Sequence, residues 1–344
     1  MEQAKMKAYR ITELGKAPHL QTIDIPQPKY GEVLIRMAGA GICHTDLEVI
    51  DHGSPVLPWE GPFTLGHENA GYIEKRGEGV TDFEIGESVI VSTIHSCGYC
   101  EYCLSGNDNY CENVSSRGLR EDGGMAEYMI ADQRELVSLG ELKPSDYVAI
   151  ADAGLTPYAS VKYAREKIPG DGYAVVIGTG GLGFFAIQFL KSLTSATVIA
   201  LDINEDRLEE MKTYGADVVF KSDEHAKAAI MELTDGKGVH AVFDFVGIDA
   251  TLKLAAEITK GLGIISLVGL GGGSLPFQWG SVKPGVELRI SQGGTLSHLR
   301  EIINLAKRGQ VKMQTQKYDF ENLSEALDDL RNGNVKGRAV LTFK

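Results

Sequence analysis

The 344-residue chain has no long apolar run, few basic residues and only five cysteines. No stretch of 18 or more apolar residues occurs, so we expect no membrane-spanning helix. The opening segment MEQAKMKAYR lacks the apolar core of a secretory signal, so we expect a cytoplasmic location. Lys and Arg total 34 against 47 Asp and Glu, which gives a net charge of −13. Since nucleic acids and anionic membranes bind through Lys and Arg, this balance argues against both as partners.

The patterning predicts two kinds of domain, within a length that suits one large domain or two ordinary ones. Short apolar runs broken by Gly and Pro occur at residues 33–39, 70–77 and 87–93, and they predict strands of a β-rich, barrel-like domain. From Asp152 onward, strands and helices alternate, which predicts βαβ units and a parallel sheet. We expect strands at residues 173–177, 197–202, 217–220, 240–247 and 263–269, and helices at 183–193 and 205–215.

The fold class is therefore α/β, with a β-rich domain and a doubly wound parallel sheet. Residues 145–167 read as helical, with Asp152 in or beside the helix. After about Leu288 the pattern becomes mixed, and we expect the tail to return to the first domain. The predicted domains are residues 1–151 with 289–344, and residues 152–288.

A glycine-rich turn follows the strand at 173–177. Gly178, Gly180 and Gly183 have the G-x-G-x-x-G spacing, between an apolar strand and a helix. In that context the glycines allow a tight turn, close approach of a pyrophosphate and close helix–strand packing, and the helix N-terminus with Gly181 and Leu182 offers free N–H groups.

Asp202 ends the next strand about 20 residues downstream, where an acid bonds a ribose 2′-hydroxyl. The same carboxylate repels a 2′-phosphate, so NAD is favoured over NADP. Arg207 either flanks the adenine or is a plain surface residue. The later run at residues 269–277 is glycine-rich too, but no clear helix follows it, and we expect a flexible loop beside the cofactor.

Four of the five cysteines lie within fifteen residues: Cys97, Cys100, Cys103 and Cys111 follow the spacing C-x2-C-x2-C-x7-C. Four thiolates complete a tetrahedral shell around zinc without an open position, which is typical of a structural site. An iron–sulfur cluster also uses four thiolates, although its bacterial spacing ends in Cys-Pro and Glu112 follows here. Disulfides do not suit the expected reducing compartment.

The fifth cysteine, Cys43, lies in GAGICHTD, and His67 and Glu68 follow in TLGHENAG. A catalytic zinc has three protein ligands and one open position, and Cys43 and His67 are candidates for two of them. A lone cysteine is otherwise a small buried apolar residue.

The chain resembles the zinc-dependent alcohol dehydrogenases of the medium-chain dehydrogenase/reductase superfamily. The motifs that carry the resemblance are GHE, the four-cysteine spacing, GGMAEY at 123–128, GTGGLG and GRAVL at 337–341. They occur in the same order as in the family, and the resemblance covers nearly the whole chain. The resemblance implies a GroES-like catalytic domain with a zinc lobe at about 94–113, a Rossmann domain, and two zincs. It assigns Cys43, His67 and Asp152 to the catalytic zinc; many members have cysteine at the third position.

Further roles are implied by the same resemblance. Thr45 would pass the proton of the alcohol toward the nicotinamide ribose, Asp46 would hold His67 in its ligating tautomer, and Glu68 would approach the metal transiently. His44 would face the cofactor phosphate. Where some members end the proton relay in histidine this chain has Glu48, so His44, His52 or solvent is left to complete it.

The candidate cofactor contacts are Gly178, Gly180, Gly181, Leu182, Gly183, Asp202, Arg207, Thr156, Val246, Val268 and Arg338, of which Thr156 would lie near the nicotinamide carboxamide and Arg338 would reach the pyrophosphate. Trp59 either borders the substrate pocket or serves packing. The predicted activity is oxidation of primary or secondary alcohols with zinc and NAD. A polyol or amino-alcohol dehydrogenase, and a non-enzymatic module that kept the fold, are the alternatives, and a homotetramer or homodimer is expected.

Overall fold

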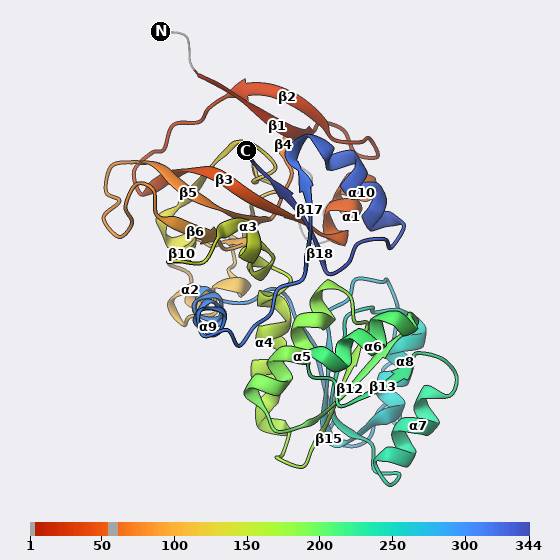
Figure 1. The fold of residues 1–344 in the computed structure, drawn as a ribbon. Coiled ribbons are helices and arrows are strands. Elements are labelled where there is room, and N and C mark those ends of the chain that lie inside the picture. The colour runs from red at the N-terminus through yellow and green to blue at the C-terminus, as the bar shows by residue number, and fades with distance from the viewer. Residues whose placement is uncertain (1–3, 54–60) are drawn as a thin grey trace. The chain divides into compact units, whose positions relative to one another are not determined.

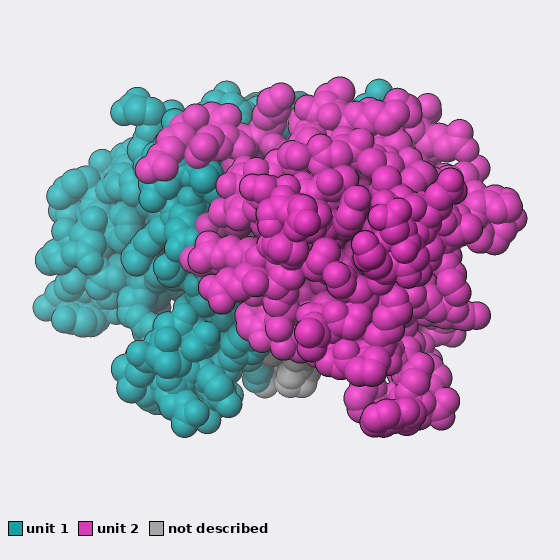
Figure 2. Space-filling view, turned by 90° about the horizontal axis from the view of Figure 1, so that it is seen from below, with its two compact units in different colours: residues 1–152, 295–307, 313–344 teal, residues 153–294, 308–312 magenta. Residues whose placement is uncertain are grey.

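The computed structural model describes residues 4–53 and 61–344, which fall into two compact units (Figures 1 and 2). Unit 1 comprises residues 1–152, 295–307 and 313–344, and unit 2 comprises residues 153–294 and 308–312. The predicted boundary after residue 288 falls inside strand β16 (Glu287–Ile290), which pairs with β15 (Thr259–Leu267) in unit 2. Unit 2 therefore extends to Gly294. The sequence did not reveal β16 because it is an edge strand of mixed polarity.

Unit 1 is built around a seven-stranded sheet with the order β10-β6-β5-β3-β18-β17, in which β9 also pairs with β3. The long central strand β3 (Glu32–Ile42) is antiparallel to β5 (Glu68–Arg76), to β9 (Tyr128–Asp132) and to β18 (Arg338–Thr342). The other strands are β6 (Ser88–Val91), β10 (Leu136–Ser138) and β17 (Thr315–Asp319). The C-terminal tail thus returns to the first domain as two strands, of which β18 pairs with β3 and β17 pairs with β18.

Smaller elements complete unit 1. A three-stranded sheet has the order β2-β1-β4. The cysteine-rich lobe lies between the paired strands β7 and β8. The remaining bounds are β1 (Lys5–Ile11), β2 (His19–Asp24), β4 (Phe63–Thr64), β7 (Ile94–His95), β8 (Ser115–Ser116), α1 (His44–His52), α2 (Glu101–Leu104), α3 (Pro144–Tyr147), α9 (Leu296–Lys307), α10 (Leu323–Arg331), and the 3₁₀ turns η1 (Asp108–Tyr110), η2 (Gln133–Glu135), η3 (Val148–Ala151) and η5 (Phe320–Asn322).

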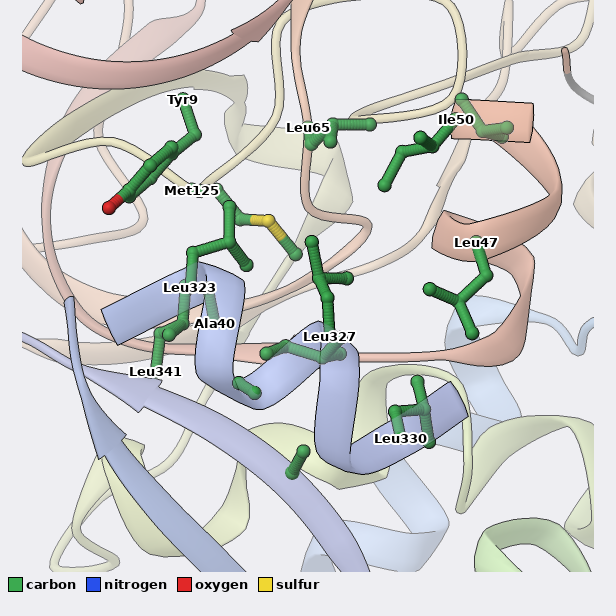
Figure 3. Packing of buried hydrophobic residues seen from close by; sticks show 14 of the residues in the cluster. Tyr9, Ala40, Leu47, Ile50, Leu65, Met125, Leu323, Leu327, Leu330 and Leu341 are labelled. Atoms are coloured by element: carbon green, nitrogen blue, oxygen red, sulfur yellow. The ribbon is translucent and has the colours of Figure 1, made fainter. Parts of the chain in front are cut away.

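One hydrophobic core of unit 1 fixes the helix that begins beside Cys43. Figure 3 shows Leu47 and Ile50 of α1 with Leu327 and Leu330 of α10, and all four are buried in one cluster. Their spacing of three residues places each pair on one helix face. This packing joins the N-terminal and C-terminal segments of the chain and holds α1 in place.

Unit 2 is a six-stranded parallel sheet with the order β13-β12-β11-β14-β15-β16. This is the 3-2-1-4-5-6 order of a doubly wound dinucleotide-binding fold. The remaining bounds are β11 (Tyr173–Ile177), β12 (Thr197–Asp202), β13 (Val218–Lys221), β14 (Val239–Asp244), α4 (Leu155–Ala164), η4 (Arg165–Lys167), α5 (Gly181–Leu193), α6 (Glu205–Tyr214), α7 (Ala226–Leu233) and α8 (Asp249–Ile258).

The helix expected at residues 145–167 is broken into α3, η3, α4 and η4. Asp152 follows η3 with φ −133° and ψ −58°, which is outside helical geometry, and Gly154 caps the start of α4. Because of this break, Asp152 lies between two helical elements and is not part of a helix. Among the described residues, no helix is both long enough and apolar enough to cross a membrane.

Candidate functional site

The first turn of α1 organises the site in unit 1. Cys43 is the residue before the helix, and its backbone N–H donates to Oδ2 of Asp46 at 2.8 Å. The other oxygen of Asp46, Oδ1, lies 3.1 Å from Nδ1 of His67. Asp46 and His67 are both fully buried. One carboxylate therefore fixes the helix start that carries Cys43 and the ring of His67 together.

The second ring nitrogen of His67, Nε2, has no hydrogen-bond partner in the protein. This nitrogen is buried, and it lies 3.7 Å from Oδ2 of Asp152. If Nδ1 carries the proton shared with Asp46, Nε2 holds a lone pair, which is the form that ligates metals. Such an orphaned buried nitrogen is unusual without a metal.

Cys43, His67 and Asp152 form a group whose ligand atoms all lie within 4.8 Å of one another, and Cys43 Sγ is 3.9 Å from Oδ2 of Asp152. A tetrahedral zinc with bonds of about 2.0–2.3 Å has ligand-to-ligand distances of roughly 3.3–3.8 Å. Sulfur, imidazole and carboxylate are all zinc ligands. Three ligands leave one position open, so the donor set fits a catalytic zinc.

The electrostatics of the group also favour a cation. Burial opposes a charged ring at His67, but Asp46 and Asp152 raise its pKa well above the ordinary value. Burial likewise opposes the charge on Arg338, but Cys43 and Glu68 raise its pKa above the ordinary value. Both shifts mean that several buried anionic groups converge here, as they would around a metal ion.

Glu68 forms an ion pair with Arg338 beside the three-residue group. Arg338 Nε donates to Oε2 of Glu68 at 3.0 Å, and Nη2 donates to Oε1 at 2.5 Å. Both side chains are buried, and Nη2 also lies 3.6 Å from Oδ2 of Asp152. The predicted phosphate contact of Arg338 stays a prediction, while the structure gives this residue an ion pair that the sequence did not indicate.

Thr93 is a positioning residue that the sequence did not single out. Its hydroxyl lies 3.0 Å from the carbonyl oxygen of His67 and 3.1 Å from that of Ala151, the residue before Asp152. One buried hydroxyl thus joins the backbone beside two of the three candidate ligands. A threonine in the short connection between β6 and β7 carries no local signal for such a contact.

The other predicted catalytic residues surround the start of α1. The Thr45 hydroxyl lies 3.5 Å from Cys43 Sγ, and Thr45 is half-buried. His44, Glu48 and His52 are exposed on the same helix. The end of the proton relay therefore stays open between His44, His52 and solvent. Trp59 lies outside the described residues.

The four clustered cysteines converge on a single point. The distance between Sγ atoms is 3.9 Å for Cys97 and Cys103, 3.5 Å for Cys100 and Cys103, and 4.0 Å for Cys100 and Cys111. All four are free thiols. These distances match four sulfurs around one zinc, whereas ligands of an iron–sulfur cluster bind separate irons and lie farther apart.

Backbone donors support the charge of these sulfurs. Cys97 N–H donates to Sγ of Cys111 at 3.2 Å, and Cys100 N–H donates to Sγ of Cys97 at 3.4 Å. The N–H of Tyr99 is the largest cause that lowers the pKa of Cys97 to about 6. Burial instead raises the pKa of Cys103 to about 12. Thiolate is the form that binds a metal, and the fit of the lobe to a closed structural zinc rests on the convergence of the four sulfurs.

The glycine turn of unit 2 has the geometry that a phosphate needs. Gly178 has φ +83°, and a Cβ on Gly183 would lie 1.9 Å from the carbonyl oxygen of Gly178. Space is open around a Cβ placed on Gly180, so nothing in the protein itself requires glycine there. Close approach of a ligand would explain it.

The carboxylate of Asp202 is tied to this turn. Its Oδ2 accepts from the N–H and the hydroxyl of Thr179 at 2.7 and 2.8 Å, and Oδ1 accepts from Asn204 N–H at 3.0 Å. Oδ1 retains capacity for a further donor, as a ribose hydroxyl would be. Arg207 lies in the first turn of α6.

The remaining cofactor candidates lie at several points of unit 2. Gly181 and Leu182 begin α5, and Thr156 is buried in α4. Val246 follows β14, and Val268 follows β15 with its N–H bonded to the carbonyl of Asp244. A Cβ on Gly178 would lie 2.7 Å from Val246. The glycine run after β15 is not a free loop, because Gly271 and Gly273 donate N–H bonds to Val246 and Gly247.

Comparisons with known proteins agree over nearly the whole chain. Residues 29–141 match the alcohol dehydrogenase GroES-like domain, and residues 181–308 match the zinc-binding dehydrogenase family. An NAD-dependent alcohol dehydrogenase of Sulfolobus acidocaldarius is 33% identical over 356 residues, with 98% of this chain and 99% of the relative covered. A D-arabinose 1-dehydrogenase (NADP(+)) of Saccharolobus solfataricus is 32% identical over 347 residues, with 99% of both covered.

A solved structure gives the same answer. The alcohol dehydrogenase of the archaeon Aeropyrum pernix superposes with a TM-score of 0.92 at 37% identity, covering 98% of this chain and 99% of that one. The predicted combination of a GroES-like domain with a Rossmann sheet is confirmed. The chain belongs to the zinc-type alcohol dehydrogenase family of the medium-chain dehydrogenases/reductases.

Proposed function

We propose that this protein oxidises primary or secondary alcohols to aldehydes or ketones with NAD and zinc, and catalyses the reverse reduction. The observation that carries the proposal is His67, whose Nε2 is buried without a partner beside Cys43 and Asp152. The relative from Sulfolobus acidocaldarius, named as NAD-dependent, supports the cofactor. In this proposal Cys43, His67 and Asp152 hold the catalytic zinc, and Cys97, Cys100, Cys103 and Cys111 hold the structural zinc.

The bound groups supply the chemistry that side chains lack. Zinc supplies a Lewis acid that stabilises negative charge developing on the substrate oxygen, and the nicotinamide supplies the hydride acceptor. The residues of the chain orient these groups. Asp46 keeps the ligand form of His67, and Thr93 holds the backbone on either side of the site.

Thr45 is placed to move the proton that leaves the alcohol. Its hydroxyl lies next to Cys43 Sγ and, at a half-buried position, can accept one proton while passing on its own. The next acceptor is His44, His52 or solvent. We propose no single member, because His44, Glu48 and His52 are all exposed on α1.

Asp202 favours NAD in our proposal, because its buried carboxylate would face a 2′-phosphate with like charge. The second candidate function is a polyol or sugar dehydrogenase, which the D-arabinose 1-dehydrogenase relative supports. NADH formation measured with short, branched, cyclic and aromatic alcohols, and with D-arabinose and polyols, separates the two. Strong preference for the sugar would favour the second function.

The metal content tests the site itself. The purified protein should contain two zincs per chain, and Cys43→Ala should contain one. The variant should lose NADH production but keep NAD binding, because Cys43 lies in unit 1 and the glycine turn lies in unit 2. A Cys43→Ala protein that keeps two zincs, or that turns over normally, contradicts the assignment.

We propose a cytoplasmic location, because all five cysteines are free thiols.

We also propose that the protein is a homodimer or homotetramer. Within the described residues β16 pairs on one side only, with β15, so its other edge is open. Within this strand, Leu288 is 44% exposed and Ile290 is 80% exposed. An open strand edge with apolar neighbours suits a second copy of the chain. Ile290→Lys should lower the molar mass measured by light scattering; an unchanged mass would place the interface elsewhere.

A further inference from the structure

Glu68 and Arg338 form their ion pair across an intervening strand. Glu68 lies in β5 and Arg338 in β18, and both strands pair with β3, which runs between them. Adjacent strands are about 4.8 Å apart, so the backbones of β5 and β18 are separated by roughly 10 Å. The two side chains therefore meet over the surface of β3.

The residue of β3 beneath this crossing is Gly41, which is directly opposite Glu68 in the register of the sheet. A Cβ on Gly41 would lie 1.8 Å from Oε2 of Glu68 and 2.8 Å from its Cβ and Cδ. Gly41 is not among the glycines with positive φ, so its backbone would accept alanine. The three atoms that such a Cβ would meet first all belong to the Glu68 side chain, so this side chain requires glycine here.

Glu68 is adjacent to the metal-ligand group without belonging to it. A single nitrogen, Nη2 of Arg338, lies 2.5 Å from Oε1 of Glu68 and 3.6 Å from Oδ2 of Asp152. Glu68 is fully buried, and a buried carboxylate that loses its cation must find another positive partner or become neutral. The nearest alternative in the proposed function is the zinc held by Cys43, His67 and Asp152.

We propose that Gly41 is a positioning residue: its missing side chain lets Glu68 cross β3 to Arg338, and this keeps the Glu68 carboxylate out of the open position of the zinc. The inference rests on the proposed function. It predicts that filling the space over Gly41 turns Glu68 into a fourth protein ligand and closes the site to small molecules.

Cobalt(II) in place of zinc, with imidazole as the probe, tests the proposal. In the unmodified protein, imidazole should bind the three-ligand cobalt and change its visible spectrum, while the closed four-cysteine site should not respond. Absence of that response would refute the proposed function itself. In Gly41→Ala the response should be lost, and in Gly41→Ala/Glu68→Ala it should return, because the competing carboxylate is gone.

The controls separate this effect from general damage to β3. Ile42→Val disturbs the packing of the next residue, which is fully buried, and should respond like the unmodified protein. Arg338→Met releases the same carboxylate with β3 unchanged and should lose the response, which keeps the proposal testable if Gly41→Ala does not fold. A Gly41→Ala protein that binds imidazole normally, or a loss that persists without Glu68, overturns the proposal.

Discussion

Asp46→Asn is the most informative single change, because Asp46 acts on two of the three candidate zinc ligands. The aspartate accepts two hydrogen bonds, one from the Cys43 N–H and one from His67 Nδ1. Asparagine keeps one acceptor oxygen and replaces the other by an amide donor. That donor must face either the Cys43 N–H or the protonated nitrogen of His67, so one bond is lost or the ring changes tautomer.

The magnitude follows from the two bonds. A buried hydrogen bond to a charged group contributes about 1.5–3 kcal/mol. Loss of an outer partner of a metal ligand lowers metal affinity about 10- to 100-fold, which corresponds to about 1.4–2.7 kcal/mol. We therefore expect Asp46→Asn to weaken zinc binding at the three-ligand site by this factor, while the four-cysteine site stays unchanged.

Competition with a chromophoric chelator measures both sites in one titration. Asp51→Asn is the matched control, since Asp51 lies in the same helix but forms a surface ion pair with Arg331 at 2.7 Å. Exposed pairs contribute about 0–1 kcal/mol, so zinc affinity should not change in this control. If Asp46→Asn retained zinc as tightly as Asp51→Asn, the role assigned to Asp46 would be refuted.

Two further predictions address the cofactor and the pH dependence of stability. Asp202→Ser should weaken the preference for NAD over NADP and also weaken NAD binding itself, since the glycine turn loses its bonds from Thr179 to Oδ2; unchanged discrimination in binding titrations would count against the ribose role. The hydrogen bond from His95 is the largest cause that lowers the pKa of Glu121 from 4.5 to about 2. A carboxyl group whose pKa is lowered by folding stabilises the fold at pH values above its unfolded pKa. This stabilisation is lost as the pH falls through the folded pKa. Glu121→Gln should therefore lower Tm at neutral pH, and the deficit should shrink between about pH 4.5 and 2; a deficit independent of pH would show that ionisation of Glu121 does not matter.

Local patterns in the sequence predicted the elements whose signals are local. The strands at 173–177 and 197–202 have the bounds that were expected, because each contains four consecutive buried apolar residues, which leave little alternative. The prediction of one helical segment across residues 145–167 was wrong, because the segment is broken into several short elements. Helical propensity favoured one long element, while the tertiary structure breaks it at Asp152.

The edge strand β16 and the return of the chain to unit 1 are also not marked by local sequence patterns. Strand β16 alternates charged and apolar residues, three of which are exposed, so no apolar run marks it. The tail reaches unit 1 only after Gly294, and residues 308–312 belong to unit 2 again. These boundaries depend on which strands pair, and pairing is not encoded in any short window.

The sequence by itself determined the four-cysteine lobe and the glycine turn, because in both the chemistry needs residues at fixed short spacings. Only the tertiary structure decided how Glu68 pairs with Arg338 over Gly41, and how Thr93 joins the backbone beside His67 and Asp152. Glu68 and Arg338 are 270 positions apart in the chain. Contacts of that kind arise from the order of strands in a sheet, and the reason for a glycine in β3 becomes visible only when the side chain that crosses it is in place.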